Sequence, residues 1–133
     1  VGRQQPPVEH SLAGPASNLI QAFIWGVLLV VLAGLGVQER FFLEMARAGV
    51  SVNLVMWAFN LFPLPPLDGG RILTGLLPPR AAMSFARIEP WGFFIVMGLV
   101  IVGVVGDLWL RPLMSLGYGV LNLLLKPLAA LFA

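Results

Sequence analysis

One acidic residue is distinctive because it follows a proline-rich run in an otherwise apolar region. Asp68 comes directly after Phe62-Pro-Leu-Pro-Pro-Leu67 and is followed by Gly69 and Gly70. A carboxylate in an apolar environment is costly to keep ionised, and such residues commonly bind metal ions or substrates. A structural explanation is equally open: Asp68 caps the short helix expected over 69–77, or pairs with Arg71 in the headgroup region of a membrane.

The prolines before Asp68 determine what the local backbone can do. Pro63, Pro65 and Pro66 forbid a regular helix and favour an extended, polyproline-like backbone. A non-helical backbone at membrane depth is tolerated where protein buries it or where a water-filled cavity hydrates it. The sequence therefore predicts a hydrated cavity beside Asp68.

Composition explains why a membrane is the expected environment. The chain has 133 residues, of which 59% are hydrophobic and 11% charged, with no cysteine and one histidine. Soluble domains have about 45–50% apolar and about 25% charged residues, and disordered chains are still more polar. A net charge of +2 is too small for nucleic-acid binding. The absence of cysteine excludes disulfides and thiolate metal sites. We therefore expect a single-domain (1–133), all-α polytopic membrane protein in contact with membrane lipid.

Apolar stretches of about 20 residues define the expected spanning helices. Three are predicted over 15–37, 41–61 and 91–110, with the Pro-rich break and a short helix between the second and third. The stretch 113–133 is either a fourth span or a helix along the interface. Trp91 and Trp109 bracket the third span and are expected to lie at the two membrane interfaces.

The distribution of cations suggests an orientation with the first span entering from the cytoplasm. This orientation places Arg3, Arg71, Arg80 and Arg87 inside, together with Lys126 if the tail spans, and Arg40, Arg47 and Arg111 outside.

Two motifs resemble those of a known family. The run Asn60-Leu-Phe-Pro-Leu-Pro-Pro-Leu-Asp-Gly-Gly-Arg71 resembles the NxxPxPPLDGGR motif of the site-2 protease family, the intramembrane zinc metalloproteases. Upstream, Ala13-Gly-Pro-Ala-Ser-Asn18 resembles the AGPxxN element of the same family. The longer motif is the more specific of the two.

The resemblance implies roles for three residues. Asp68 matches the third zinc ligand, Asn60 matches the asparagine thought to hold substrate or the oxyanion, and Asn18 matches an asparagine with a catalytic or a packing role. In that family two imidazoles and one carboxylate leave a fourth zinc position for water, whose pKa falls to about 7. The implied substrates are transmembrane proteins, and the implied location is the bacterial inner membrane.

The other half of the family's site, an H-E-x-x-H helix with two zinc ligands and the general base, is absent from this sequence. His10 is the only histidine, and its position directly before the AGPxxN element predicts a solvated residue next to the membrane. We therefore expect this chain to be inactive and to bind no zinc tightly by itself. It is a portion of a longer protease, which the lack of an initiator methionine favours, or works with a separate HExxH-bearing chain, or is a non-catalytic scaffold that binds transmembrane helices.

Overall fold

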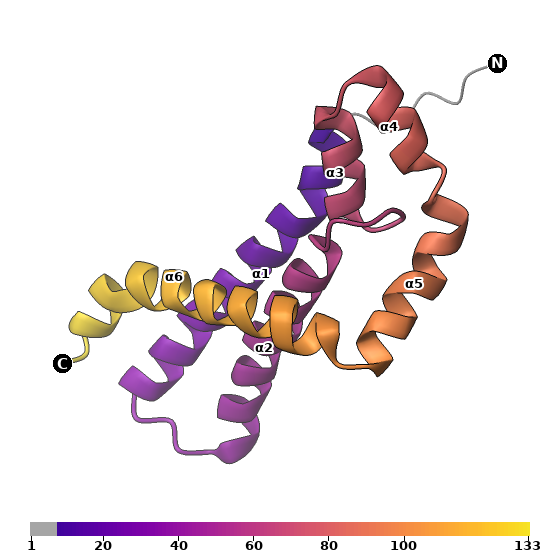
Figure 1. Ribbon diagram of the computed structural model, residues 1–133. Helices are drawn as coiled ribbons and strands as arrows, with labels where there is room; N and C mark the ends of the chain where they lie inside the picture. Colours follow the sequence, from indigo (N-terminus) through magenta and orange to yellow (C-terminus); the bar gives the residue numbers. More distant parts are fainter. Residues whose placement is uncertain (1–7) are drawn as a thin grey trace.

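The computed structural model describes residues 8–133, and within this range all regular structure is helical. The elements are α1 (Val8–Gly34), α2 (Arg40–Asn60), α3 (Asp68–Leu76), α4 (Pro79–Ala86), α5 (Glu89–Ile101), the π-helical segment η1 (Val105–Leu110) and α6 (Arg111–Ala130) (Figure 1). The expected all-α class, with a break before a short helix, is confirmed.

Two helices are long and apolar enough to cross a membrane, namely α1 and the continuous helix Val105–Ala130 formed by η1 and α6. The pair α4 and α5, bent by 64° at its break, adds a third if it acts as one broken span. Helix α2 has 21 residues but carries Glu44 and Arg47 in its first half, and it does not meet the same criterion. The described residues therefore contain two or three candidate spans.

The helix expected over 91–110 is divided in the structure. Helix α5 ends at Ile101 after 13 residues, a length of about 20 Å that is too short for a bilayer core of about 30 Å. Gly103 follows with φ +86, a left-handed conformation that glycine adopts without a steric penalty and that commonly ends helices. Residues 105–110 then continue into α6, so the last helix begins earlier than the expected 113.

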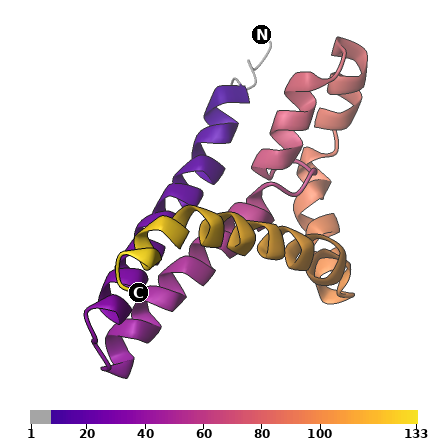
Figure 2. The ribbon, with the colours of Figure 1, turned by 90° about the vertical axis from the view of Figure 1, so that its left-hand side faces the viewer.

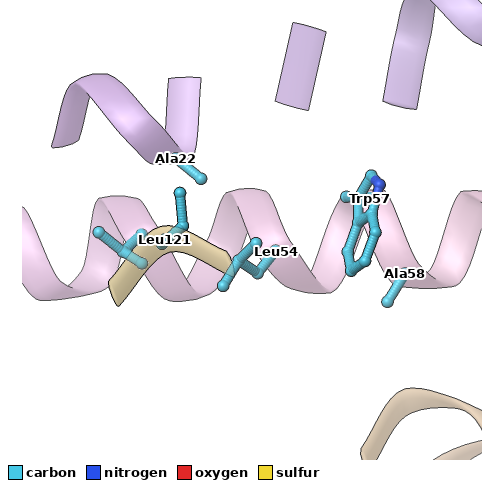
Figure 3. Packing of buried hydrophobic residues seen from close by; sticks show 6 residues of the cluster. Ala22, Leu54, Trp57, Ala58 and Leu121 are labelled. Carbon is cyan, nitrogen blue, oxygen red and sulfur yellow. The ribbon is translucent and has the colours of Figure 1, made fainter. Parts of the chain in front are cut away.

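The core lies where α1 and α6 pack on α2. Val50, Leu54, Trp57 and Ala58 of α2 are buried with Ala22 of α1 and Leu121 of α6 (Figure 3). Helix α6 crosses α1 and α2 obliquely in both views of the ribbon (Figures 1 and 2). Glycines allow this close approach: a Cβ on Gly117 of α6 would lie 3.0 Å from Leu54 and 3.1 Å from Trp57.

Contacts at the two ends of the last helix fix its direction. At its start, the Trp109 side chain lies against Ala58 near the end of α2, and beyond its end Phe132 packs on Gly34, the last residue of α1. This helix therefore runs opposite to α2, and Lys126 comes to line the same cavity as Arg47. The structure thus differs from the orientation above, in which a spanning tail places Lys126 on the side opposite to Arg47.

We expect Gly117→Leu to lower the stability of the detergent-solubilised protein by about 1–3 kcal/mol, because the larger side chain must displace Leu54 and Trp57. Thermal unfolding followed by tryptophan fluorescence measures the effect. The matched control is Gly119→Leu on the same helix, where a Cβ meets nothing within 4 Å. Equal melting temperatures for the two variants would contradict this packing.

Candidate functional site

Asp68 is the first residue of α3 and follows the Pro-rich loop 61–67. The N-cap residue of α3 is Leu67, and no side chain caps the helix. Arg71 donates a hydrogen bond from Nη2 to Oε1 of Glu89, at 2.9 Å, and forms an ion pair with that residue. The structure therefore does not support the two structural explanations of Asp68, as a side-chain cap or as the ion-pair partner of Arg71.

The two motifs meet in space at the Asp68 carboxylate. A Cβ built on Gly14 of α1 would lie 3.1 Å from Oδ2 of Asp68, closer than nine in ten real Cβ contacts. Any larger residue at position 14 would press on the carboxylate. Helix α1 thus forms one wall beside Asp68, and the AGPxxN element supplies the glycine that makes room for it.

The two asparagines lie on the helices that flank this contact. Asn18 is buried on the face of α1 that also buries Ser11, Pro15 and Ala22, one turn beyond Gly14. Asn60 is the last residue of α2 and is half-buried, so it stands where the chain leaves the helix for the Pro-rich loop. The structure shows where both side chains belong in the fold, and their roles stay predictions.

Glycines on two helices pack against the loop backbone. Gly69 and Gly70 of α3 are buried, and a Cβ on either would overlap loop backbone, at Leu61 and at Leu64–Pro65 respectively. Gly92 of α5 is also buried, and its Cβ would overlap the carbonyl oxygen of Pro65. Sequence reasoning missed Gly92, because nothing in its local pattern shows that α5 returns to the loop.

Trp109 contacts the last turn of α2 and the start of the Pro-rich loop. Its Nε1–H donates a hydrogen bond of 2.8 Å to the carbonyl oxygen of Ala58, in the last turn of α2. Its ring meets Phe62 edge to face, with centroids 5.5 Å apart. The last-turn carbonyls of a helix have no partner within the helix, so this bond satisfies one of them. Trp109 therefore fixes the end of α2, and its location at a membrane interface stays a prediction.

The charged groups considered at the site are the Asp68 carboxylate and the Arg71 guanidinium. Asp68 is partly buried, and this burial raises the pKa of its carboxyl group, while the positive charge of Arg71 acts in the opposite direction. His10 is exposed in the first turns of α1, as expected for a solvated residue.

The residues from 8 to 133 do not build a zinc site of their own. They contain no group of three or more His, Cys, Asp or Glu side chains that could hold a metal ion. Protein zinc sites need three or four such ligands. The role of Asp68 as a metal ligand stays a prediction.

Cavities bounded by residues from 8 to 133 include two that Asp68 and its prolines do not line. One of about 430 Å³ lies between α1, α2 and α6, and one of about 340 Å³ lies between α1 and α6. A hydrated cavity beside Asp68 stays a prediction.

We expect Gly92→Ala to destabilise the protein by about 1–3 kcal/mol, because the added methyl group must push the Pro65 carbonyl away. Hydrogen exchange of the amides in 61–70 should accelerate in this variant. Gly98→Ala on the same helix is the control, since a Cβ there meets nothing within 4 Å and alanine favours helix. Unchanged exchange in Gly92→Ala would show that α5 does not support the loop.

Comparison with known proteins agrees with the two motifs. Residues 37–103, half of the chain, match the profile of Peptidase family M50. YwhC of Bacillus subtilis, whose name describes a zinc metalloprotease, is 36% identical over 131 residues, which cover 92% of this chain and 56% of YwhC.

Two further relatives, also named as zinc metalloproteases, come from mycobacteria. Rip3 of Mycobacterium tuberculosis is 32% identical over 111 residues, covering 75% of this chain and 28% of Rip3. Rip2 of Mycolicibacterium smegmatis is 37% identical over 99 residues, covering 68% of this chain and 34% of Rip2. No solved structure matches the chain. The chain spans about half or less of the length of these relatives, and it belongs to peptidase family M50, the site-2 protease family of membrane zinc metalloproteases.

Proposed function

We propose that this chain forms part of an intramembrane zinc protease, to which it contributes Asp68 as one metal ligand. The observation that carries this proposal is the contact between the two motifs, because Gly14 of the AGPxxN element lies directly against the carboxylate of the LDG element. Membership of family M50 supports it. The remaining ligands and the general base are supplied by residues outside this chain, as the partial coverage of its relatives allows.

The fold supports this role by holding the carboxylate in place. Helix α1 restricts Asp68 from one side through Gly14, and the start of α3 fixes its backbone. Burial raises the pKa of the Asp68 carboxyl group, while Arg71 and the positive end of the α3 dipole act toward the ionised form, which is the form that binds metal. Asp68 can therefore serve as one ligand when the other ligands are brought to it.

We propose that the loop and the end of α2 bind substrate. The prolines between Phe62 and Leu67 keep this backbone out of a helix and have no N–H, and the N–H groups of Leu64 and Leu67 are hydrogen-bonded within the loop. The loop therefore offers backbone carbonyl oxygens, as acceptors, to a substrate strand that has unwound. Asn60 stands at the entrance to the loop, where its amide can hold a substrate carbonyl. We propose a transmembrane protein as the substrate class and the bacterial inner membrane as the location.

The decisive experiment replaces Asp68 by Asn in the complete protein. The amide keeps the size of the side chain but loses the negative charge, and we expect zinc affinity to fall by about 100-fold or more, since loss of even an outer-shell partner costs 10–100-fold. Zinc content after dialysis against a mild chelator and cleavage of a membrane-embedded reporter should fall together.

Asp107→Asn is the matched control. That carboxylate is exposed and pairs with Arg111 at 3.3 Å, in the last helix and not in α3. It should keep both zinc and cleavage. Full zinc content in Asp68→Asn would remove Asp68 from the ligand set. A complete wild-type protein without zinc or cleavage would instead favour a scaffold that binds transmembrane helices.

The 133-residue chain by itself should show no peptidase activity and no tightly bound zinc, because the described residues offer no three-ligand group. Metal analysis of the purified chain after dialysis measures this directly. One zinc per chain surviving that treatment would contradict the prediction.

A further inference from the structure

The larger cavity lies between three helices at a distance from the motifs. It has a volume of about 430 Å³ and is bounded by α1, α2 and α6. Its apolar walls come from all three helices and include Leu29, Val30, Val50, Leu121 and Leu125. This size falls in the range of small-molecule sites, about 300–1,000 Å³, and these walls suit a hydrocarbon chain.

One edge of the cavity is cationic and polar. Arg47 of α2 and Lys126 of α6 both line it, although they are far apart in the sequence. Ser51 and Tyr118, whose hydroxyl groups are hydrogen-bonded to each other, also line it, together with Asn122. No Asp or Glu is among the residues that line this cavity. The edge therefore offers positive charge and hydrogen-bond donors to an anion.

Glu44 does not cancel this charge. It pairs with Arg47 through one nitrogen, Nη1, at 3.0 Å, and both side chains are more than half exposed. A guanidinium has five N–H donors, so Arg47 keeps others for a second acceptor. Lys126 is exposed as well. Arg47, Lys126 and Glu44 together leave one net positive charge.

Both cations lie near the ends of their helices, where lipid headgroups are expected. Arg47 lies about two turns after α2 begins, and Lys126 lies about one turn before α6 ends. The start of α2 and the end of α6 lie on the same side of the bundle. Phe132 beyond α6 packs on Gly34, the last residue of α1, and a short connection leads from there to the start of α2. Cationic side chains near helix ends reach the interface, where lipid phosphates lie.

We propose that this cavity is a binding site for an anionic phospholipid, with an acyl chain between α1, α2 and α6 and the phosphate between Arg47 and Lys126. The combination of an apolar interior with a cationic edge fits this amphiphile better than a zwitterionic lipid, whose own ammonium group cancels the charge of its phosphate. Basic pockets between membrane helices bind anionic headgroups in the same manner. The site is separate from Asp68 and does not depend on metal binding or proteolysis.

The test measures lipid binding to the complete protein in detergent by native mass spectrometry. We expect phosphatidylglycerol to bind about tenfold more tightly than phosphatidylcholine with the same acyl chains. The double variant Arg47→Gln with Lys126→Gln should lose this preference and bind both lipids alike. Soluble glycerol phosphate should not compete, because it lacks the acyl chain that the cavity holds.

Two matched variants make the result specific. Arg80→Gln with Arg87→Gln removes the same charge from α4 and its C-cap and should keep the preference. Val30→Trp should fill the apolar part of the cavity and weaken the binding of both lipids. The proposal is overturned if wild type shows no preference, if both double variants lose it equally, or if Val30→Trp leaves binding unchanged.

A photo-crosslinking residue at Leu29 identifies the occupant in membranes. Adducts with phosphatidylglycerol are expected. An adduct with another segment of the complete protein, or with a substrate helix, would show that the cavity is a protein interface and would overturn the proposal.

Discussion

The structure depends on how a stretch of non-helical backbone is held between two helices. Prolines keep the loop 61–67 out of a helix, and its remaining N–H groups bond to carbonyl oxygens of the loop itself and of the last turn of α2. Close backbone packing then fixes the loop: Gly69 and Gly70 of α3 and Gly92 of α5 leave no room for a side chain against it. Trp109 adds a hydrogen bond to the last turn of α2. Asp68 directly follows the loop, so this packing also sets the position of Asp68.

The proposed functions draw on different parts of the same bundle. Asp68, Asn60 and the loop lie where α2 ends, and the proposed lipid site lies toward the other end of α2, where α6 crosses it. The buried contacts of Leu54 and Trp57 with α6 lie between these two regions. Helix α2 is thus the common support, although it is less apolar than the candidate spans around it.

Family membership and geometry complement each other here. The M50 match covers residues 37–103 and runs from α2 through the loop to the end of α5, while α1 and α6 lie outside it. Yet α1 supplies the glycine beside the Asp68 carboxylate, and Trp109, in the segment leading into α6, caps the exit of α2. The elements outside the match therefore position the residues within it.

The sequence by itself determined the helical class, the break at the prolines and the short helix after it, because the geometry of proline is a local property. It also singled out Asp68 as the candidate ligand, because the cost of a carboxylate in apolar surroundings is local as well. Only the tertiary structure decided that Gly103 divides the third expected helix, that Arg71 pairs with Glu89, and that Trp109 faces α2. It also decided that Gly14 and Gly92 enclose the site and that Arg47 and Lys126 share a cavity. These contacts join residues far apart in the chain, and they follow from how the helices cross, which no local pattern of residues encodes.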